Sequence, residues 1–238
     1  MTILQLAIAS LSVGIGALIQ GSIGFGLNVV AAPVLVLIDT TLVPGPALFA
    51  ALALTILVGT RERGGIDAKG FGWLILGRLP ATTAAAFTVA VLPERGLAIA
   101  LAASVLVAVG LSLAGWKVRR TPATLVTVGA LSGVMGTISS VGGPPVAMAY
   151  QDARGAQLRG TLSAILGFGA TFSCVMLSIA GRFGTEEIRA SLVLLPGIVV
   201  GFIASRWTAH LLDRGFVRPA VLGFSAASAI AAIVRYAI

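Results

Sequence analysis

Long apolar stretches separated by short polar breaks run along the chain from residue 3 to residue 238. The breaks contain charged or turn-forming residues and divide the chain into eight apolar blocks; they cover residues 39–45, 61–69, 93–96, 117–122, 151–160, 182–189 and 206–219. The apolar runs repeatedly exceed the roughly 18 residues that are typical of a membrane-spanning helix. The pattern therefore predicts an all-α integral membrane protein without a soluble domain.

Two of the blocks are interrupted deep inside apolar sequence. The block at residues 3–38 has 36 residues and would be about 54 Å long as one helix, against a hydrocarbon core of roughly 30 Å. It is interrupted at residues 21–26 (Gly-Ser-Ile-Gly-Phe-Gly), and the block at 123–150 is interrupted at residues 136–145. Glycine and proline weaken a helix and leave backbone groups without partners. Because lipid cannot bind these groups, they should face protein or a watery cavity, which indicates a site.

The two interruptions share one spacing. The first has glycine at 21 and 24 and Pro-Val at 33–34; the second has glycine at 133 and 136 and Pro-Val at 145–146, a constant offset of 112 residues. This offset is close to half the chain and predicts a duplicated unit, with halves at about 1–116 and 117–238. Repeats that carry broken helices at corresponding positions are typical of secondary transporters.

The lysines and arginines of the loops distinguish two topologies, because cytoplasmic loops carry the excess. If each interrupted block crosses the membrane once, these charges divide nine against six; if each enters and returns as a hairpin, they divide eleven against four. We therefore predict both chain ends outside and two inverted repeats, each with one broken re-entrant hairpin and three transmembrane helices. The first repeat, 1–116, would have its hairpin at 3–38 and spans at about 43–60, 70–92 and 97–116; the second, 117–238, would have its hairpin at 123–150 and spans at about 160–181, 188–206 and 217–238.

The composition excludes several functions. Hydrophobic residues make up 58% of the chain and charged residues 10%, with a mean hydropathy of +1.05, whereas soluble domains carry about 25% charged residues. The net charge of +8 lies in short clusters between spans, which is typical of topology signals and does not indicate a nucleic-acid partner. The single cysteine, Cys174, excludes an internal disulfide and a cysteine-based metal cluster. We expect neither a metal nor a cofactor.

The interruptions concentrate residues that suit an anion. Hydroxyls, amides and freed backbone N–H groups can surround an oxyanion, and the N-termini of half-helices add partial positive charge. The candidate substrate-binding residues are Gln20, Gly21, Gly24, Phe25, Gly26, Asn28 and Pro33 in the first interruption and Gly133, Gly136, Thr137, Ser139, Ser140, Gly142, Gly143, Pro144 and Pro145 in the second. For any single glycine, close helix packing through small residues is the alternative.

Arg78 stands inside an apolar block, between Gly77 and Leu79. A buried arginine would be a direct partner for an anion. However, Arg78 is only nine residues past Lys69, and a long side chain can reach the membrane interface from that depth. It is therefore a candidate for a secondary anion contact. All eight acidic residues lie in or beside the predicted loops, which disfavours proton coupling through a buried carboxylate.

The segments at residues 21–26 and 33–35 and at residues 136–145 resemble those of the TauE/SafE sulfite exporters, also called toluene sulfonate uptake permeases. The resemblance extends over the whole chain in length, repeat and short loops. It implies a secondary carrier of sulfite, organosulfonates or other small organic anions in the bacterial inner membrane. The family's glycine-rich segments correspond here to Gly21, Gly24, Gly26 and Pro33 and to Gly136, Gly142, Gly143, Pro144 and Pro145, and glycine is frequent in the family where this chain has Leu27 and Ser140.

Three functions fit these observations. The first is an anion carrier that works by alternating access around a midplane site formed by the two interruptions, and the second is a passive anion channel lined by the same hairpins. The third is a serine-type intramembrane hydrolase, for which Ser132, Ser139 or Ser140 would need a base, whereas the single histidine, His210, stands at the end of a span. We expect a small anion and the lipid bilayer as partners. The sequence leaves open the anion, the direction, any coupling ion and the oligomeric state, a homodimer being one option.

Overall fold

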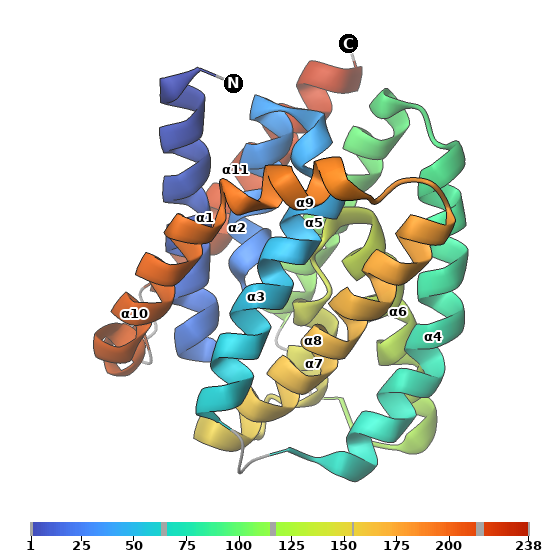
Figure 1. Cartoon of the computed structure of the whole chain (residues 1–238). Coiled ribbons are helices and arrows are strands. Elements are labelled where there is room, and N and C mark those ends of the chain that lie inside the picture. The colour runs from blue at the N-terminus through green and yellow to red at the C-terminus, as the bar shows by residue number, and fades with distance from the viewer. Residues whose placement is uncertain (1, 63–65, 115–117, 154, 213–216, 238) are drawn as a thin grey trace.

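The computed structural model describes residues 2–62, 66–114, 118–153, 155–212 and 217–237, with side chains except those of residues 156, 208–212, 217–221 and 237. Within these residues every regular element is helical: α1 (Ile3–Ile23), α2 (Leu27–Ile38), the 3-10 helix η1 (Thr40–Leu42), α3 (Gly45–Arg61), α4 (Ala68–Val91), α5 (Glu94–Ala114), α6 (Pro122–Ser139), α7 (Gly143–Ala149), α8 (Gly155–Ile179), α9 (Thr185–Leu192), α10 (Leu195–Leu212) and α11 (Val217–Ala237). The long helices pack into one bundle, in which α1 begins and α11 ends at the same end (Figure 1). The all-α prediction is confirmed.

The first predicted interruption is the gap between α1 and α2. Gly24 and Gly26 have φ values of +96° and +127° there, a backbone conformation that residues with a side chain rarely adopt. The chain turns back at this point, so that Leu27 packs against Gly16 of the preceding helix, where a Cβ would stand 2.4 Å from the Leu27 carbonyl oxygen. α1 and α2 thus form a hairpin within the fold.

The second interruption is the gap between α6 and α7. Its left-handed residue is Ser140, with φ 61°. Past this turn, the Gly142 carbonyl accepts a hydrogen bond of 2.6 Å from Ser132 Oγ, which holds the returning chain against α6. α7 then begins with Pro144 and Pro145 in its first turn, where the missing N–H groups need no helical partner. How both hairpins lie in a membrane stays a prediction.

Glycines let the long helices approach each other closely. α4 lies against α6, where a Cβ at Gly77 would stand 1.9 Å from the Val126 carbonyl oxygen. α1 lies against α10, where a Cβ at Gly201 would stand 2.2 Å from the Gly14 carbonyl oxygen. Small residues of this kind are common at helix interfaces in membranes, where backbones pack without intervening side chains.

The predicted span at 188–206 is two helices in the structure. α9 and α10 are separated by a short break and bent by 50° relative to each other. Pro196, in the first turn of α10, has no N–H group to bond the Leu192 carbonyl, so the helix of Leu192 cannot continue through it. The apolar block predicted as a span at about 188–206 thus contains a bend, which a count of apolar residues does not register.

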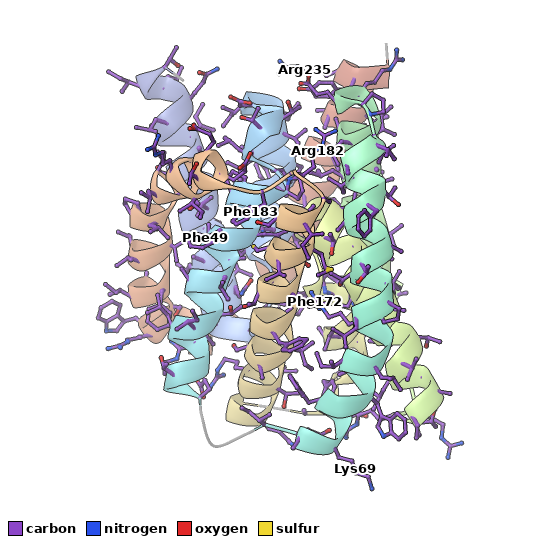
Figure 2. The ribbon with its side chains drawn as sticks, turned by 45° about the vertical axis from the view of Figure 1, so that its right-hand side comes forward. Phe49, Lys69, Phe172, Arg182, Phe183 and Arg235 are labelled. Carbon is purple, nitrogen blue, oxygen red and sulfur yellow. The ribbon has the colours of Figure 1, made fainter. Side chains whose placement is uncertain are left out.

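The surface of the bundle suits a membrane. Six helices of the described chain are long and apolar enough to cross one, and α9 with α10 adds a seventh if the bent pair counts as one span. The six include α1 and α6, the first arms of the two hairpins. Large apolar side chains such as Leu4, Phe87 and Val200 are exposed along the sides. Lys69 lies at one end of the bundle and Arg182 and Arg235 at the other (Figure 2).

Candidate functional site

A small cavity with a volume of about 30 Å³ lies where the two interruptions meet. Its wall combines residues of both hairpins with residues of α3, α4 and α8: Gln20, Gly26, Asn28, Val29, Leu48, Ala51, Thr55, Arg78, Gly136, Ser140, Val141, Gly142, Gly143, Pro144, Leu166 and Ala170. A space of this size holds about one or two water molecules. A sulfonate could therefore enter only if side chains or helices moved.

Arg78 is the charged residue of the cavity wall. It projects from the middle of α4 with 2% of its surface exposed, so it turns into the bundle and does not extend to an interface. Its Nη1 donates to Ser132 Oγ at 2.6 Å, while its Nε has no partner among the described residues. None of the salt bridges between described residues includes Arg78. A buried guanidinium without a carboxylate is unfavourable, and an anion in the cavity would relieve that penalty.

Glycines on the facing helices make room for the guanidinium. A Cβ at Gly169 of α8 would stand 2.0 Å from Arg78 Cζ, and a Cβ at Gly136 of α6 would stand 2.9 Å from Nη2. At Gly142, before α7, a Cβ would be 3.3 Å from the same Nη2. Larger residues at position 169 would therefore displace the charge from the cavity wall.

Hydrogen bonds join the first hairpin, α3 and the second interruption beside the cavity. The Asn28 side-chain amide donates to the Ala47 carbonyl at 3.3 Å and to the Ser140 carbonyl at 3.2 Å. Ser140 Oγ donates to the Pro44 carbonyl at 3.0 Å. Ser140 is also the residue with φ 61°, at a position where the resemblance implies frequent glycine. Its hydroxyl and the Asn28 amide are thus engaged with backbone groups.

The start of α2 adds to the positive potential at the cavity. Gly26, the N-cap of α2, and Asn28 in its first turn both line the wall. Gln20 Oε1 accepts a hydrogen bond from the Leu27 N–H at 3.1 Å, which fixes α1 against this helix end. The N-terminus of a helix carries a partial positive charge. The cavity is therefore electropositive from α2 as well as from α4.

Nine of the predicted residues line the cavity, and the other eight do not: Gly21, Gly24, Phe25, Pro33, Gly133, Thr137, Ser139 and Pro145. Two of these eight carry hydroxyls that were expected to bind the anion. Thr137 Oγ1 donates to the Gly133 carbonyl at 2.8 Å and lies 2.9 Å from Ser173 Oγ of α8, and Ser139 Oγ donates to the Met135 carbonyl at 2.7 Å. Both residues are fully buried; the Ser139 hydroxyl bonds within α6, and the Thr137 hydroxyl bonds both α6 and α8.

The remaining residues of this group support the hairpins. Phe25 packs against Gly143, where a Cβ would stand 2.7 Å from Phe25 Cβ. The Gly21 carbonyl accepts a hydrogen bond from Arg61. A Cβ at Gly24 would stand 2.9 Å from the Leu162 side chain. Gly133 faces the Arg78 backbone, and Pro33 and Pro145 are buried in α2 and α7.

Three residues that line the cavity or contact the guanidinium were not among the predicted binding residues. Thr55 lines the cavity from α3, Ser132 accepts from Arg78, and Gly169 lies under the guanidinium. Thr55 and Ser132 are polar residues within apolar blocks, which is a signal available in the sequence. Gly169 has no such signal, because many glycines of this chain serve helix packing alone.

An ionic cluster lies at the end of α3, near the break between α1 and α2. Glu62 Oε1 accepts from Arg159 Nε at 2.9 Å and from Arg61 Nε at 3.2 Å; we call these three residues the Glu62 clamp. Arg61 also donates to the Gly21 carbonyl and, at 3.2 Å, to Ser205 Oγ. Burial raises the pKa of Glu62, but the hydrogen bonds and charges of Arg159 and Arg61 outweigh burial and hold this pKa below its ordinary value. The clamp links α1, α3, α8 and α10.

Comparison with known proteins gives the family of this chain. A family model described as sulfite exporter TauE/SafE matches residues 8–232. The chain belongs to the TauE/SafE family. It is therefore a multi-pass membrane transporter of a family that exports sulfite and related sulfur anions. Neither a curated protein sequence nor a solved structure matches the chain significantly.

Membership of the TauE/SafE family sets aside the hydrolase hypothesis, because the family consists of transporters and not enzymes. The serines considered as nucleophiles also have other partners. Ser132, Ser139 and Ser140 each donate to a backbone carbonyl, and the ionisable partner given for these hydroxyls among the described residues is Arg78, which donates to Ser132 and stays protonated. The side chain of His210 lies outside the described residues. In the described part of the chain, no three His, Cys, Asp or Glu side chains gather as a metal site.

Proposed function

We propose that this TauE/SafE protein is a secondary carrier that moves a small sulfur oxyanion, such as sulfite or an organosulfonate, across the bacterial inner membrane by alternating access. The observation that carries the proposal is Arg78, which is buried in the wall of a cavity between the two hairpins and has an unpaired Nε. Guanidinium groups bind planar and tetrahedral oxyanions through several N–H donors at once. An oxyanion in this cavity would supply the acceptors that Arg78 lacks.

The inverted-repeat hypothesis gains support from two contacts at the centre of the bundle. Asn28 bonds the carbonyl of Ser140, which is 112 positions away, the same offset that relates the two interruptions. A Cβ at Gly167 would stand 3.2 Å from Thr55 Oγ1, and these residues are also 112 positions apart. Residues on a two-fold axis between repeats lie next to their own counterparts. Such an axis through the cavity would make the two halves exchange roles during transport.

The proposed route to the cavity follows the interface between α3 and α8. A groove with a volume of about 420 Å³ runs there, from Thr60 in the last turn of α3 and Ile66 just before α4 to Thr55, which also lines the cavity. Gly167 of α8 packs against Thr55 at the inner end of this groove. If α3 and α8 separated, the groove and the cavity would join. This movement would open the cavity on the side of the bundle that carries Lys69.

The test is transport by the purified full chain in proteoliposomes. Uptake of radiolabelled sulfite should saturate with concentration, and unlabelled sulfite inside the vesicles should accelerate it. Arg78→Gln should reduce the initial rate by about 10- to 100-fold, because hydrogen bonds to a charged group contribute about 1.5–3 kcal/mol. Arg189→Gln is the matched control, since its side chain is 75% exposed on α9 and should leave the rate unchanged.

A passive channel would give a different result. Its flux would not be accelerated by substrate on the far side, and single-channel currents would appear in planar bilayers. If sulfite and organosulfonates cross neither wild-type nor Arg78→Gln vesicles faster than empty vesicles, the sulfur-anion proposal is wrong. If they cross equally fast in both proteins, Arg78 does not bind the substrate.

A further inference from the structure

We propose that the cavity accepts its substrate as a monoanion, so that bisulfite and organosulfonates bind while the sulfite dianion and sulfate are excluded. This inference rests on the proposed function, because it takes the Arg78 cavity as the substrate site. It goes beyond that function by assigning the charge of the bound species. The charge matters because sulfite exists in both forms near neutral pH.

The described groups that surround the guanidinium carry no charge. Ser132 and Gly136 face it from α6, Gly169 faces it from α8, and Gly142 faces it from the loop before α7. The hydrogen bond from Ser132 to the Gly142 carbonyl orients the serine oxygen as an acceptor for Arg78. The guanidinium is therefore held by neutral groups and keeps its full positive charge.

The ionisable groups of the other packed elements lie away from the cavity. Cys174 of α8 packs in an apolar cluster with Ala86 and Val89 of α4. No acidic residue lines the cavity, and the described ones lie at or between helix ends: Asp39, Glu62, Asp67, Glu94, Asp152, Glu186 and Glu187. Across the cavity from α4, the polar residues of the wall are neutral: Gln20, Asn28, Thr55 and Ser140. The net charge of the described wall is thus that of one arginine.

Charge balance decides which anion fits this wall. Arginine stays protonated in proteins, so the empty cavity carries one positive charge. A monoanion makes the occupied cavity neutral, whereas a dianion leaves one uncompensated negative charge in the same buried space. The penalty for burying net charge in a medium of low polarity applies to either sign. The neutral complex is the most stable of the three, so the cavity should discriminate by charge among oxyanions of similar size.

Sulfite and methanesulfonate together provide the test. Sulfite changes from bisulfite to the dianion near neutral pH, while methanesulfonate remains a monoanion. Methanesulfonate is therefore the control, because any titration of the protein itself would affect the binding of both ligands. Binding of each ligand is measured by calorimetry on the purified full chain in detergent, from one pH unit below neutrality to one unit above. Above the midpoint of its own titration, the apparent Kd for total sulfite should rise in inverse proportion to the remaining bisulfite fraction, approaching about tenfold for each pH unit. The Kd for methanesulfonate should stay constant, and sulfate should not compete with it.

Two substitutions connect the charge preference to Arg78. Arg78→Lys keeps the positive charge and should keep the preference for monoanions, although it offers fewer donors. Arg78→Gln removes the countercharge and should weaken the binding of methanesulfonate about tenfold or more; if this variant does not fold, the lysine variant and the wild-type pH series still carry the test. The proposal is overturned if wild-type protein binds sulfite independently of pH, or sulfate as tightly as methanesulfonate, or if Arg78→Gln binds methanesulfonate as tightly as the wild type. If no sulfur anion binds or is transported at all, the proposed function fails instead.

Discussion

Replacing Gly77 by alanine should destabilise the protein, because Gly77 lies where α4 touches the backbone of α6. The added Cβ would stand 1.9 Å from the Val126 carbonyl oxygen, 2.7 Å from its carbon and 3.1 Å from the Ala130 nitrogen. These are backbone atoms of a helix, so no side-chain rotation can relieve the overlap. The two helices would have to move apart by about 1 Å or more to restore ordinary contact distances.

The expected loss of stability follows from two opposing effects. Alanine is intrinsically better than glycine inside a helix by about 1 kcal/mol. Overpacking a well-packed interface costs typically about 1–3 kcal/mol and sometimes more, and an overlap with backbone belongs at the upper end. We therefore expect Gly77→Ala to lower the free energy of unfolding by about 2 kcal/mol. Transport should fall as well, because Arg78 is the next residue and would move away from Ser132.

The assay is thermal unfolding of the purified protein in detergent, followed by loss of the monodisperse peak in size-exclusion chromatography. Gly72→Ala is the matched control on the same helix, since a Cβ there meets nothing within 4 Å. This control should leave the melting temperature unchanged or raise it. If Gly77→Ala melts at the same temperature as Gly72→Ala, the close approach of α4 and α6 does not contribute to stability, and the reasoning is refuted.

Three further outcomes are expected. Glu62→Gln should lower the melting temperature at neutral pH by weakening the Glu62 clamp. Because the folded pKa of Glu62 lies below its ordinary value of 4.5, the wild type should melt at a higher temperature than this variant above pH 4.5, and the difference should vanish as the pH falls through the folded pKa. A difference in melting temperature that persists in strong acid would contradict the clamp. Ser132→Ala should destabilise the fold by about 1–3 kcal/mol, because a buried N–H of Arg78 loses its acceptor, and a melting temperature equal to that of the wild type would mean that another group replaces the hydroxyl. If the loaded cavity is neutral, the rate at which labelled methanesulfonate exchanges for unlabelled methanesulfonate in proteoliposomes should be independent of membrane voltage. The rate of net efflux should depend on membrane voltage, by up to about 50-fold per 100 mV for one full charge. Voltage-dependent exchange would show that the loaded form is charged.

The order of apolar blocks and breaks in the sequence was sufficient to predict most of the fold. Helices α1 to α5 nearly coincide with the apolar blocks of the first half, and the breaks at Gly24 and Ser140 lie inside the predicted interruptions. Such features are readable because helix length and helix-breaking residues are local properties of the chain. The interruptions also carried the family resemblance, which the family comparison confirmed. The bend between α9 and α10 was missed, although Pro196 is a local signal for it.

The sequence by itself therefore determined an all-helical membrane protein with two interrupted helices and the candidate residues in them. The tertiary structure decided which of those residues share a cavity, because that depends on the helix face to which each side chain points and on the helix opposite it. Arg78 had two possible positions in the sequence, at an interface or inside the bundle, and the glycines at 136, 142 and 169 from other elements make room for it inside. In the same way, contacts with α6 and α8 engage Thr137 in packing, while α3 brings Thr55 to the cavity wall. Such contacts between distant segments have no local sequence signal, so only the packed fold specifies them.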